Sequence, residues 1–246
     1  INSKQDYLYY IEADRIAKSI PKKRSFLSLL KGFFYPNIWE FQKLLRKCEY
    51  YSNCKKGFFC NLYKTYIYFR FKNVSTKLGF SIPINVFGPG LSIAHVGTII
   101  VSGNAKVGAN CRLHACTNIG TEAGYTDRAP VIGDNCYIGP GVKMFGEIEL
   151  KDGMVIGANA VVTKSFETSS SVLLGIPAKI IKEIYSFDFL IPATLIIDGN
   201  LNVPAETLIN YLDRHHRKRL ESLAGKVLPI IKQDCFDGKV FTSTCQ

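Results

Sequence analysis

The stretch VIGDNCYIGPGVKMFGEIELKDGMVIGANAVV (131–162) has an aliphatic residue or a methionine at every sixth position. These positions are Ile132, Ile138, Met144, Leu150, Ile156 and Val162, and the series continues to Leu174 and Ile180 with Thr168 as an interruption. An upstream series runs through Val101, Val107, Leu113 and Ile119. Neither the helical period nor strand alternation produces a strict period of six. The repeat therefore indicates short stacked units that bury their faces against one another.

Six residues suit one flat side of a coil, in which a short strand covers the aliphatic position and glycine or asparagine turns the chain. Three such sides close a coil of about 18 residues, and successive coils stack at the strand spacing of about 4.8 Å. Cys111 and Cys136, two positions before aliphatic ones, are expected inside the coil. The step from Ile119 to Ile132 is one residue longer than two repeats, so residues 121–130 (TEAGYTDRAP) are predicted to loop out.

Counting back by six from Val101 places His95 where the repeat elsewhere has an aliphatic side chain. A buried neutral imidazole without partners costs about 1–3 kcal/mol. Three interpretations are open: a core histidine bonded to the backbone, an irregular first coil, or a general base that titrates near neutrality. His114 follows Leu113, so its side chain is expected to point outward at a corner close to His95, either as a second site residue or as a solvated histidine.

The basic residues are concentrated in the first third of the chain. Residues 1–80 contain 16 Lys and Arg against 5 Asp and Glu, whereas the remainder contains 15 of each. This step predicts a boundary between a basic helical region (1–78) and the repeat region (79–184). Apolar residues spaced three and four apart predict helices within 6–20 and 36–53, and the aromatic-rich stretch 57–73 is expected to form a third. The basic, aromatic surface is expected to pack on neighbouring chains or to lie on an anionic membrane; no nucleic-acid motif is present, so nucleic acid is not expected as a partner.

The chain has no apolar run of the roughly 18 residues that a membrane span needs, and no signal peptide is visible. A cytoplasmic location is expected, with possible contact at the inner membrane surface. The eight cysteines are expected to be reduced thiols, and Cys48, Cys54 and Cys60 lack the spacing of a zinc site, so no metal is expected. Residues 185–246 form a C-terminal extension of unassigned role, with a helix predicted over about 204–223 that would cap the open end of the coils.

Residues 82–182 resemble the left-handed parallel β-helix of the hexapeptide-repeat acyltransferases. The resemblance implies an α+β chain: this β-helix, preceded by a helical N-terminal region and followed by a mostly helical C-terminal extension. The stretch GPGLSIAHVGTIIVSGNAKVGANCRLHACTNIGT (88–121) is similar without gaps to the part of serine O-acetyltransferases that holds their catalytic histidine, which falls on His95. In that family the histidine takes the proton of an acceptor hydroxyl as it attacks the thioester of acetyl-CoA. His114 is a candidate second catalytic histidine.

The resemblance also implies the substrate-binding positions. Asp127 and Arg128 match a pair that helps to hold an acidic acceptor. The positions matched to the acetyl-CoA groove are Gly120, Thr121, Pro140 and Ala158 along the pantetheine arm, and Lys164 and Lys179 near the nucleotide end. Lys179 closes the motif GIPAK (175–179), which often accompanies acetyltransferases of this group.

The acceptor half of the pattern is altered. Serine acetyltransferases have an aspartate before the catalytic histidine and a histidine after the Asp-Arg pair, where this chain has Ala94 and Ala129. The stretches IPINVFGPGLSIAHVG and LHACTNIGT resemble more closely the serine-acetyltransferase-like enzymes of capsule and surface-polysaccharide gene clusters. The predicted activity is therefore acetylation of a sugar hydroxyl or amine. The alternatives are a serine O-acetyltransferase of cysteine biosynthesis and a non-catalytic repeat scaffold.

Two further expectations follow from the architecture. A carbonic anhydrase of the repeat class needs three metal-binding histidines, whereas the repeat region contains two, so this activity is not expected. One flat coil face cannot enclose an acceptor alone, so the active site is expected between adjacent β-helices of a homotrimer.

Overall fold

The computed structural model describes residues 1–21, 37–184 and 186–199. Its helices are α1 (Lys4–Ala17), α3 (Ile38–Cys54), α4 (Phe58–Leu78) and α5 (Ala193–Asp198), with a 3₁₀ turn, η1 (Ser186–Asp188). Its strands are β1 (Phe80–Ser81), β2 (Ser92–Ile93), β3 (Ile99–Val101), β4 (Lys106–Val107), β5 (Arg112–Leu113), β6 (Thr117–Gly120), β7 (Val131–Ile132), β8 (Tyr137–Ile138), β9 (Lys143–Phe145), β10 (Glu149–Leu150), β11 (Val155–Ile156), β12 (Val161–Val162), β13 (Ser171–Leu174) and β14 (Lys179–Glu183). The three helices predicted before the repeat are confirmed.

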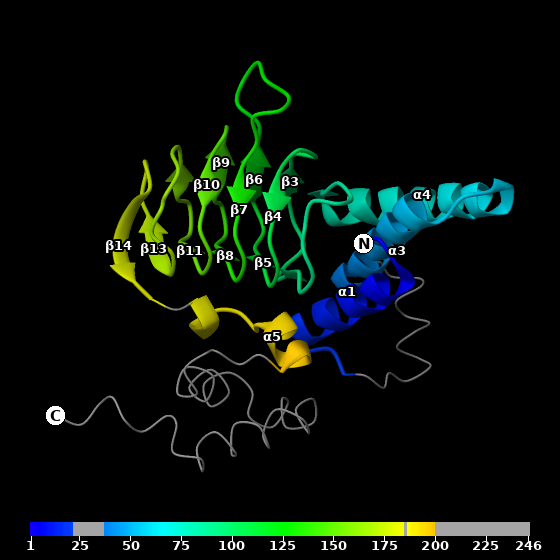
Figure 1. Cartoon of the computed structure of the whole chain (residues 1–246). Coiled ribbons are helices and arrows are strands. Elements are labelled where there is room, and N and C mark those ends of the chain that lie inside the picture. The colour runs from blue at the N-terminus through cyan, green and yellow to red at the C-terminus, as the bar shows by residue number, and fades with distance from the viewer. Residues whose placement is uncertain (22–36, 185, 200–246) are drawn as a thin grey trace, which may run out of the picture.

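The strands make the three sides of a stacked parallel coil (Figure 1). The first side is β1-β3-β6-β9-β12, the second β4-β7-β10, and the third β2-β5-β8-β11-β13-β14. Each coil visits the sides in this order, and among the strands that the structure describes only β14 pairs antiparallel to its neighbour. We call the turns from the third side to the first (94–98, 114–116, 139–142 and 157–160) the His corner. The turns from the first side to the second (102–105, 121–130, 146–148 and 163–165) are the loop corner.

The repeat positions fill the interior as predicted over most of the chain. Leu113, Ile138 and Ile156 are fully buried and pair in register down the third side. The prediction is wrong at the last two positions, because Leu174 and Ile180 are each 41% exposed. The strand partner of Ile156 is Leu173 and not Leu174, so the register moves by one position across the interruption of the repeat.

The N-terminal helices continue the core of the β-helix. Phe41 of α3 packs against Phe71 of α4 and Phe80 of β1, with ring centroids 5.3 and 5.0 Å away. Helix α4 ends at Gly79, whose φ of +76° is a left-handed conformation that glycine adopts cheaply. The next residue opens the first strand, so the first coil is closed at this end by helices rather than by solvent.

A buried ion pair fixes the helices to the first coil. Asp14 of α1 and Arg46 of α3 are both fully buried, and the Arg46 Nε donates to an Asp14 carboxylate oxygen at 2.8 Å. The same carboxylate accepts the backbone N–H groups of Gly90 and Leu91, at 2.9 and 2.8 Å. Arg46 also donates to the carbonyls of residues 87 and 88. Each charge therefore has several partners, as a buried ion pair requires.

The chain beyond β14 returns along the third side instead of staying at the far end. The backbone N–H and hydroxyl group of Thr194 are hydrogen bonded to Asn110, and Tyr9 of α1 donates to Asp198 at 2.9 Å. Ile191 and Ala193 share a small apolar cluster with α1 (Figure 1). The helix predicted over 204–223, with its capping role, lies outside the described residues.

We predict that Asp14→Ala lowers the free energy of unfolding by about 3–5 kcal/mol, because it leaves the Arg46 charge buried without its main partner. Urea denaturation followed by circular dichroism measures the loss. Glu149→Ala is the control: Glu149 pairs with Lys151 at the surface, and its loss is expected to cost less than about 1 kcal/mol. Equal effects of the two substitutions would show that the buried pair does not anchor the helices.

Candidate active site

His95 lies at the His corner and not inside the coil. The interior position that the spacing assigned to His95 is taken by Ile93, which is fully buried and pairs with Leu113. Leu113 and Ile119 hold consecutive interior positions one repeat apart, whereas the equivalent pair in the preceding coil, Ile93 and Val101, has two extra residues in between. These extra residues carry His95 to the surface, where its side chain is exposed. The irregular first coil, one of the three interpretations, is what the structure shows.

His114 occupies the same corner in the next coil. The backbone before His114 is hydrogen bonded to the backbone before His95, since the Ala94 N–H donates to the Leu113 carbonyl at 2.9 Å. The imidazole rings of His95 and His114 are 5.9 Å apart between centroids. The expectation that the two histidines are neighbours is confirmed, and they form the one pair of titratable bases that projects from this corner among the described residues.

Arg112 sets the chemical state of His114. The Arg112 Nε donates to His114 Nε2 at 3.4 Å, so the neutral imidazole carries its proton on Nδ1. Burial of the half-exposed ring, the Arg112 cation and His95 together lower the pKa of His114 to about 4. His114 is therefore a neutral hydrogen-bond donor at physiological pH. His95, in contrast, is exposed at the surface of the corner.

A lysine from outside the repeat lies near this corner. Lys18, at the C-terminal cap of α1, donates to the carbonyl oxygen of Ile93 at 2.5 Å. Burial and the nearby Arg112 cation lower the pKa of Lys18 to about 8, and Asp14 opposes the shift. Arg112 and Lys18 make this end of the His corner electropositive.

An aromatic row continues from His114 down the third side. The ring of Tyr137 lies 5.0 Å from His114, and the ring of Phe189 lies 5.3 Å from Tyr137. Tyr137 follows Arg112 in the strand register, and Phe189 comes from the returning C-terminal segment. Sequence reasoning missed both of them, as well as Lys18. The pairing of coils could have placed Tyr137 beside His114, but no sequence signal places Phe189 there.

Two of the predicted acetyl-CoA positions lie on the same corner as the histidines. Pro140 and Ala158 occupy equivalent places in the next two coils, and Asn159 N–H donates to the Pro140 carbonyl at 2.8 Å. Both side chains are small and exposed. The His corner is thus a column that begins with two imidazoles and continues as a shallow, exposed backbone surface.

The other predicted positions lie on the loop corner or at the end of the β-helix. Gly120 ends β6, and a Cβ at this position would lie 2.6 Å from the Phe145 ring, so a larger residue there would force that ring to move. Thr121 follows it, and Lys164 lies two coils further on, with its Nζ 5.6 Å from the centroid of the Phe166 ring. Lys179 begins β14 and is exposed. One chain therefore does not bring all six predicted cofactor positions to one corner.

The predicted loop is confirmed and belongs to the loop corner. Tyr137 pairs with Arg112 on one side and with Val155 on the other, and the coil that starts at Arg112 carries seven extra residues relative to the coil that starts at Tyr137. Arg128 donates to Glu122 at 3.0 Å, and its guanidinium lies 3.6 Å from the Tyr125 ring centroid. Asp127 is exposed beside it. These contacts keep Arg128 within the loop, at a different corner from His95 and His114.

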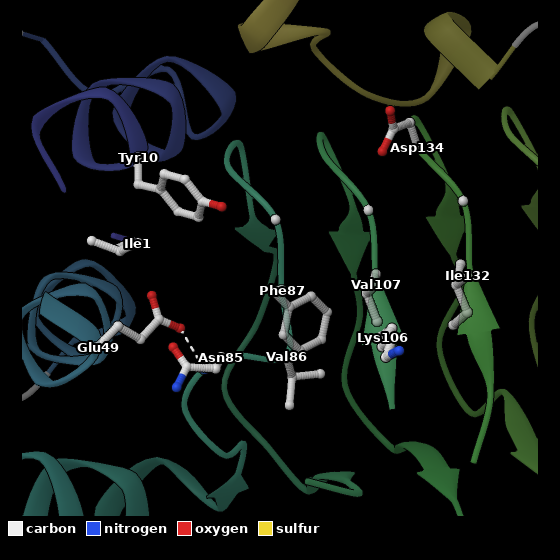
Figure 2. Close-up of a pocket in the computed structure, with 13 residues that line it drawn as sticks. Ile1, Tyr10, Glu49, Asn85, Val86, Phe87, Lys106, Val107, Ile132 and Asp134 are labelled. Carbon is white, nitrogen blue, oxygen red and sulfur yellow. Dashed lines mark hydrogen bonds between the residues drawn. The ribbon is translucent and has the colours of Figure 1, made fainter. Parts of the chain in front are cut away.

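A pocket of about 440 Å³ lies elsewhere, between the N-terminal helices and the second side (Figure 2). Tyr10, Glu49, Phe87 and Lys106 are among its lining residues. The carboxylate of Glu49 accepts the N–H of Asn85 at 2.9 Å, shown dashed in Figure 2, and is also bonded to the Arg46 guanidinium. The acidic group is therefore already engaged in the contact between helix and coil, and neither histidine lines the pocket.

The sequence of the chain resembles part of several known proteins. No profile of a protein family matches the chain. The serine acetyltransferase of Mycobacterium tuberculosis is 34% identical over 100 residues, which are 40% of this chain and 43% of that protein. The chain thus spans less than half the length of the curated relatives that it matches.

Two crystal structures of serine acetyltransferases share the architecture. That of Brucella abortus in complex with coenzyme A has a TM-score of 0.53 at 22% identity, covering 73% of this chain and 68% of that one. That of Neisseria gonorrhoeae in complex with serine has a TM-score of 0.52 at 23% identity, covering 73% and 71%. The parallel coil of this chain therefore has the left-handed β-helix fold of these structures.

We predict that the imidazole of His114 titrates at about pH 4 and that Arg112→Gln raises this pKa, because the substitution removes a neighbouring cation. Nuclear magnetic resonance titration of the imidazole C–H signals measures both values, with His114→Asn to assign the signal among the chain's four histidines. Since the pKa is lower in the folded than in the unfolded chain, the unfolded chain binds more protons between about pH 6.5 and 4. The free energy of unfolding should therefore decrease as the pH is lowered from about 6.5 to 4, and it should decrease less in His114→Asn. A His114 pKa above 6 would contradict the assigned state.

Proposed function

We propose that this chain is an acetyl-CoA-dependent O-acetyltransferase. The proposal rests on the pair of imidazoles 5.9 Å apart at an exposed corner, one of which is held neutral. Two bases in different protonation environments can divide the tasks of proton transfer and hydrogen-bond donation. The names of the relatives and of the structural neighbours support acetyl transfer as the chemistry.

His95 acts as the general base. It takes the proton from the acceptor hydroxyl as that oxygen forms a bond to the thioester carbonyl carbon. The carbon–sulfur bond then breaks, and the imidazolium returns the proton to the leaving thiolate, which gives the ester and free thiol. His114 donates a hydrogen bond from Nδ1 and does not compete for the proton, because the nearby Arg112 cation and burial keep it neutral.

The acyl donor fits the His corner. A pantetheine arm is long and narrow, and it needs a path without large side chains, which Pro140 and Ala158 provide beneath the histidines. The exposed Lys179 at the end of the β-helix suits a phosphate group at the nucleotide end, and Lys164 would reach the donor from the loop corner of a neighbouring copy. When bound, acetyl-CoA supplies the activated acyl group, and the protein supplies orientation and proton transfer.

The acceptor that the comparisons favour is L-serine. The sugar acceptor expected from the sequence has no support among them, whereas the matched proteins are named serine acetyltransferases and a structural neighbour holds serine. Arg128 offers a planar guanidinium that suits the serine carboxylate. Ala94 and Ala129 lack the polar groups that the resemblance leads one to expect, so we propose that other groups near the corner, such as Arg112 or Tyr137, take over part of their role.

The complete site is assembled from two copies of the chain. His95 and His114 lie at the His corner, whereas Arg128, Gly120 and Thr121 lie at the loop corner. Rotation about a threefold axis sets one corner of a coil beside the other corner of its neighbour, which is a heterologous, closed interface. The first side lies between these corners and has Ile100 and Phe145 44% and 45% exposed on its outer face. A homotrimer would cover them.

We predict that His95→Ala lowers the rate of coenzyme A release from acetyl-CoA and L-serine by about 10²–10⁴-fold, since the general base is removed. Release of the thiol is followed with a chromogenic disulfide. Sedimentation of wild type and variant should give three times the chain mass of 27.5 kDa, which separates lost chemistry from lost assembly.

The acceptor is tested in the same assay, with L-serine in one reaction and nucleotide-linked or lipid-linked sugars in others. Release with L-serine supports the proposed acceptor, and release with a sugar alone would replace it. Full activity of His95→Ala would refute the general-base assignment. The absence of release with every acceptor would leave the non-catalytic scaffold as the better account.

A further inference from the structure

Helix α4 has a continuous apolar stripe that faces solvent. The stripe consists of Phe58, Phe59, Leu62, Tyr66 and Phe69, which are 78%, 82%, 65%, 53% and 64% exposed. At about 100° per residue, these five side chains fall within an arc of about 100° on one face of the helix. Four of the five are aromatic, so the stripe is a large contact surface with little conformational entropy to lose.

The folding of the described chain does not use this stripe. The opposite face of α4 supplies the buried residues Ile67, Phe71, Val74 and Leu78, which join the core of α3 and the first coil. The N-terminal half of α4 extends away from the β-helix, as Figure 1 shows at its right-hand end. Exposed apolar surface of this extent on a helix usually marks a surface that contacts a partner.

The charged residues of α4 itself are all basic. From residue 50 to residue 121 the sequence contains no Asp or Glu. The cations on α4 or just before it are Lys55, Lys56, Lys64, Arg70, Lys72 and Lys77. Arg70 pairs with Glu40 of α3, and the neighbouring lysines 55, 56 and 72 are exposed. The partner of the stripe must therefore offer an apolar region that buries these side chains and negatively charged groups that pair with the lysines.

We propose that α4 lies on the surface of an anionic lipid bilayer, with the stripe at the boundary between headgroups and acyl chains. Helices that lie in the membrane interface typically have phenylalanine and leucine on one face and lysines beside them. Acidic lipid headgroups attract each nearby cation, and the attraction is screened by salt. None of the helices in the described part of the chain combines the length and hydropathy of a membrane span, so α4 would lie on the bilayer rather than cross it.

A second copy of the same face is the less suitable partner. An isologous contact sets identical patches against each other. The cations of one copy would then meet the cations of the other, without a carboxylate from residues 50–121 to pair with them. The inference concerns a surface at the helical end of the molecule, and it does not depend on the proposed acetyl transfer.

Flotation of the full chain with lipid vesicles tests the proposal. Wild type should float with vesicles of phosphatidylcholine mixed with phosphatidylglycerol, and much less with phosphatidylcholine alone. The triple variant Phe58→Gln/Phe59→Gln/Leu62→Gln should reduce the partition coefficient by about tenfold or more, because three apolar groups no longer leave water. Lys56→Gln/Lys72→Gln/Lys77→Gln, which changes exposed lysines before the stripe or at its edges, should also bind less tightly and with weaker dependence on salt.

A matched control removes equal numbers of exposed apolar side chains elsewhere. Leu8→Gln/Val131→Gln/Ile181→Gln changes residues 54%, 43% and 58% exposed, away from α4, and should float like wild type. Circular dichroism and thermal unfolding show that each variant is folded. The proposal is overturned if wild type does not float, if the stripe variant floats as well as wild type, or if the stripe variant has a smaller oligomeric mass, which would make the stripe an interface between copies.

Discussion

The parallel hydrogen bonds between successive coils are the constraint on which the structure depends. Each side contributes one short strand per coil, and each strand must present a buried aliphatic or small residue in register with its neighbours, as Leu113, Ile138 and Ile156 do. Residues on the sides are therefore committed to packing. Only the corners can differ in length and in side chain without breaking the stack, and the two insertions that shape the site fall there. One brings His95 to the surface beside His114, and the other extrudes the loop that carries Arg128.

Segments outside the repeat complete the surroundings of the His corner. The buried pair of Asp14 and Arg46 holds α1 against the first coil, and α1 in turn places Lys18 on the carbonyl of Ile93. The returning C-terminal segment brings Phe189 to Tyr137 on the other flank. A bare β-helix corner is a shallow surface, and these contacts give it positive charge on one flank and an aromatic wall on the other.

The repeat of six predicted the coils, their interior and the extruded loop, because the interior tolerates few residue types. It failed where the coil length changes: a count anchored at Val101 cannot detect the two extra residues after Ile93, and for that reason it placed His95 inside the coil. The neighbourhood of His114 was predictable from the stacking, since corner residues of adjacent coils must lie close together. Lys18 and Phe189 were not predictable, because their positions depend on the packing of segments without a repeat.

We propose that the acetyl-transfer site is shared between the His corner of one copy and the loop corner of the next. Co-expression of His95→Ala and Arg128→Ala chains with different affinity tags, followed by isolation of the mixed trimers, tests it directly. Each variant alone should be nearly inactive, whereas mixed trimers should recover about a third of the wild-type rate of coenzyme A release, because one interface in each then combines an intact His95 with an intact Arg128. Mixed trimers as inactive as either parent would contradict the shared site.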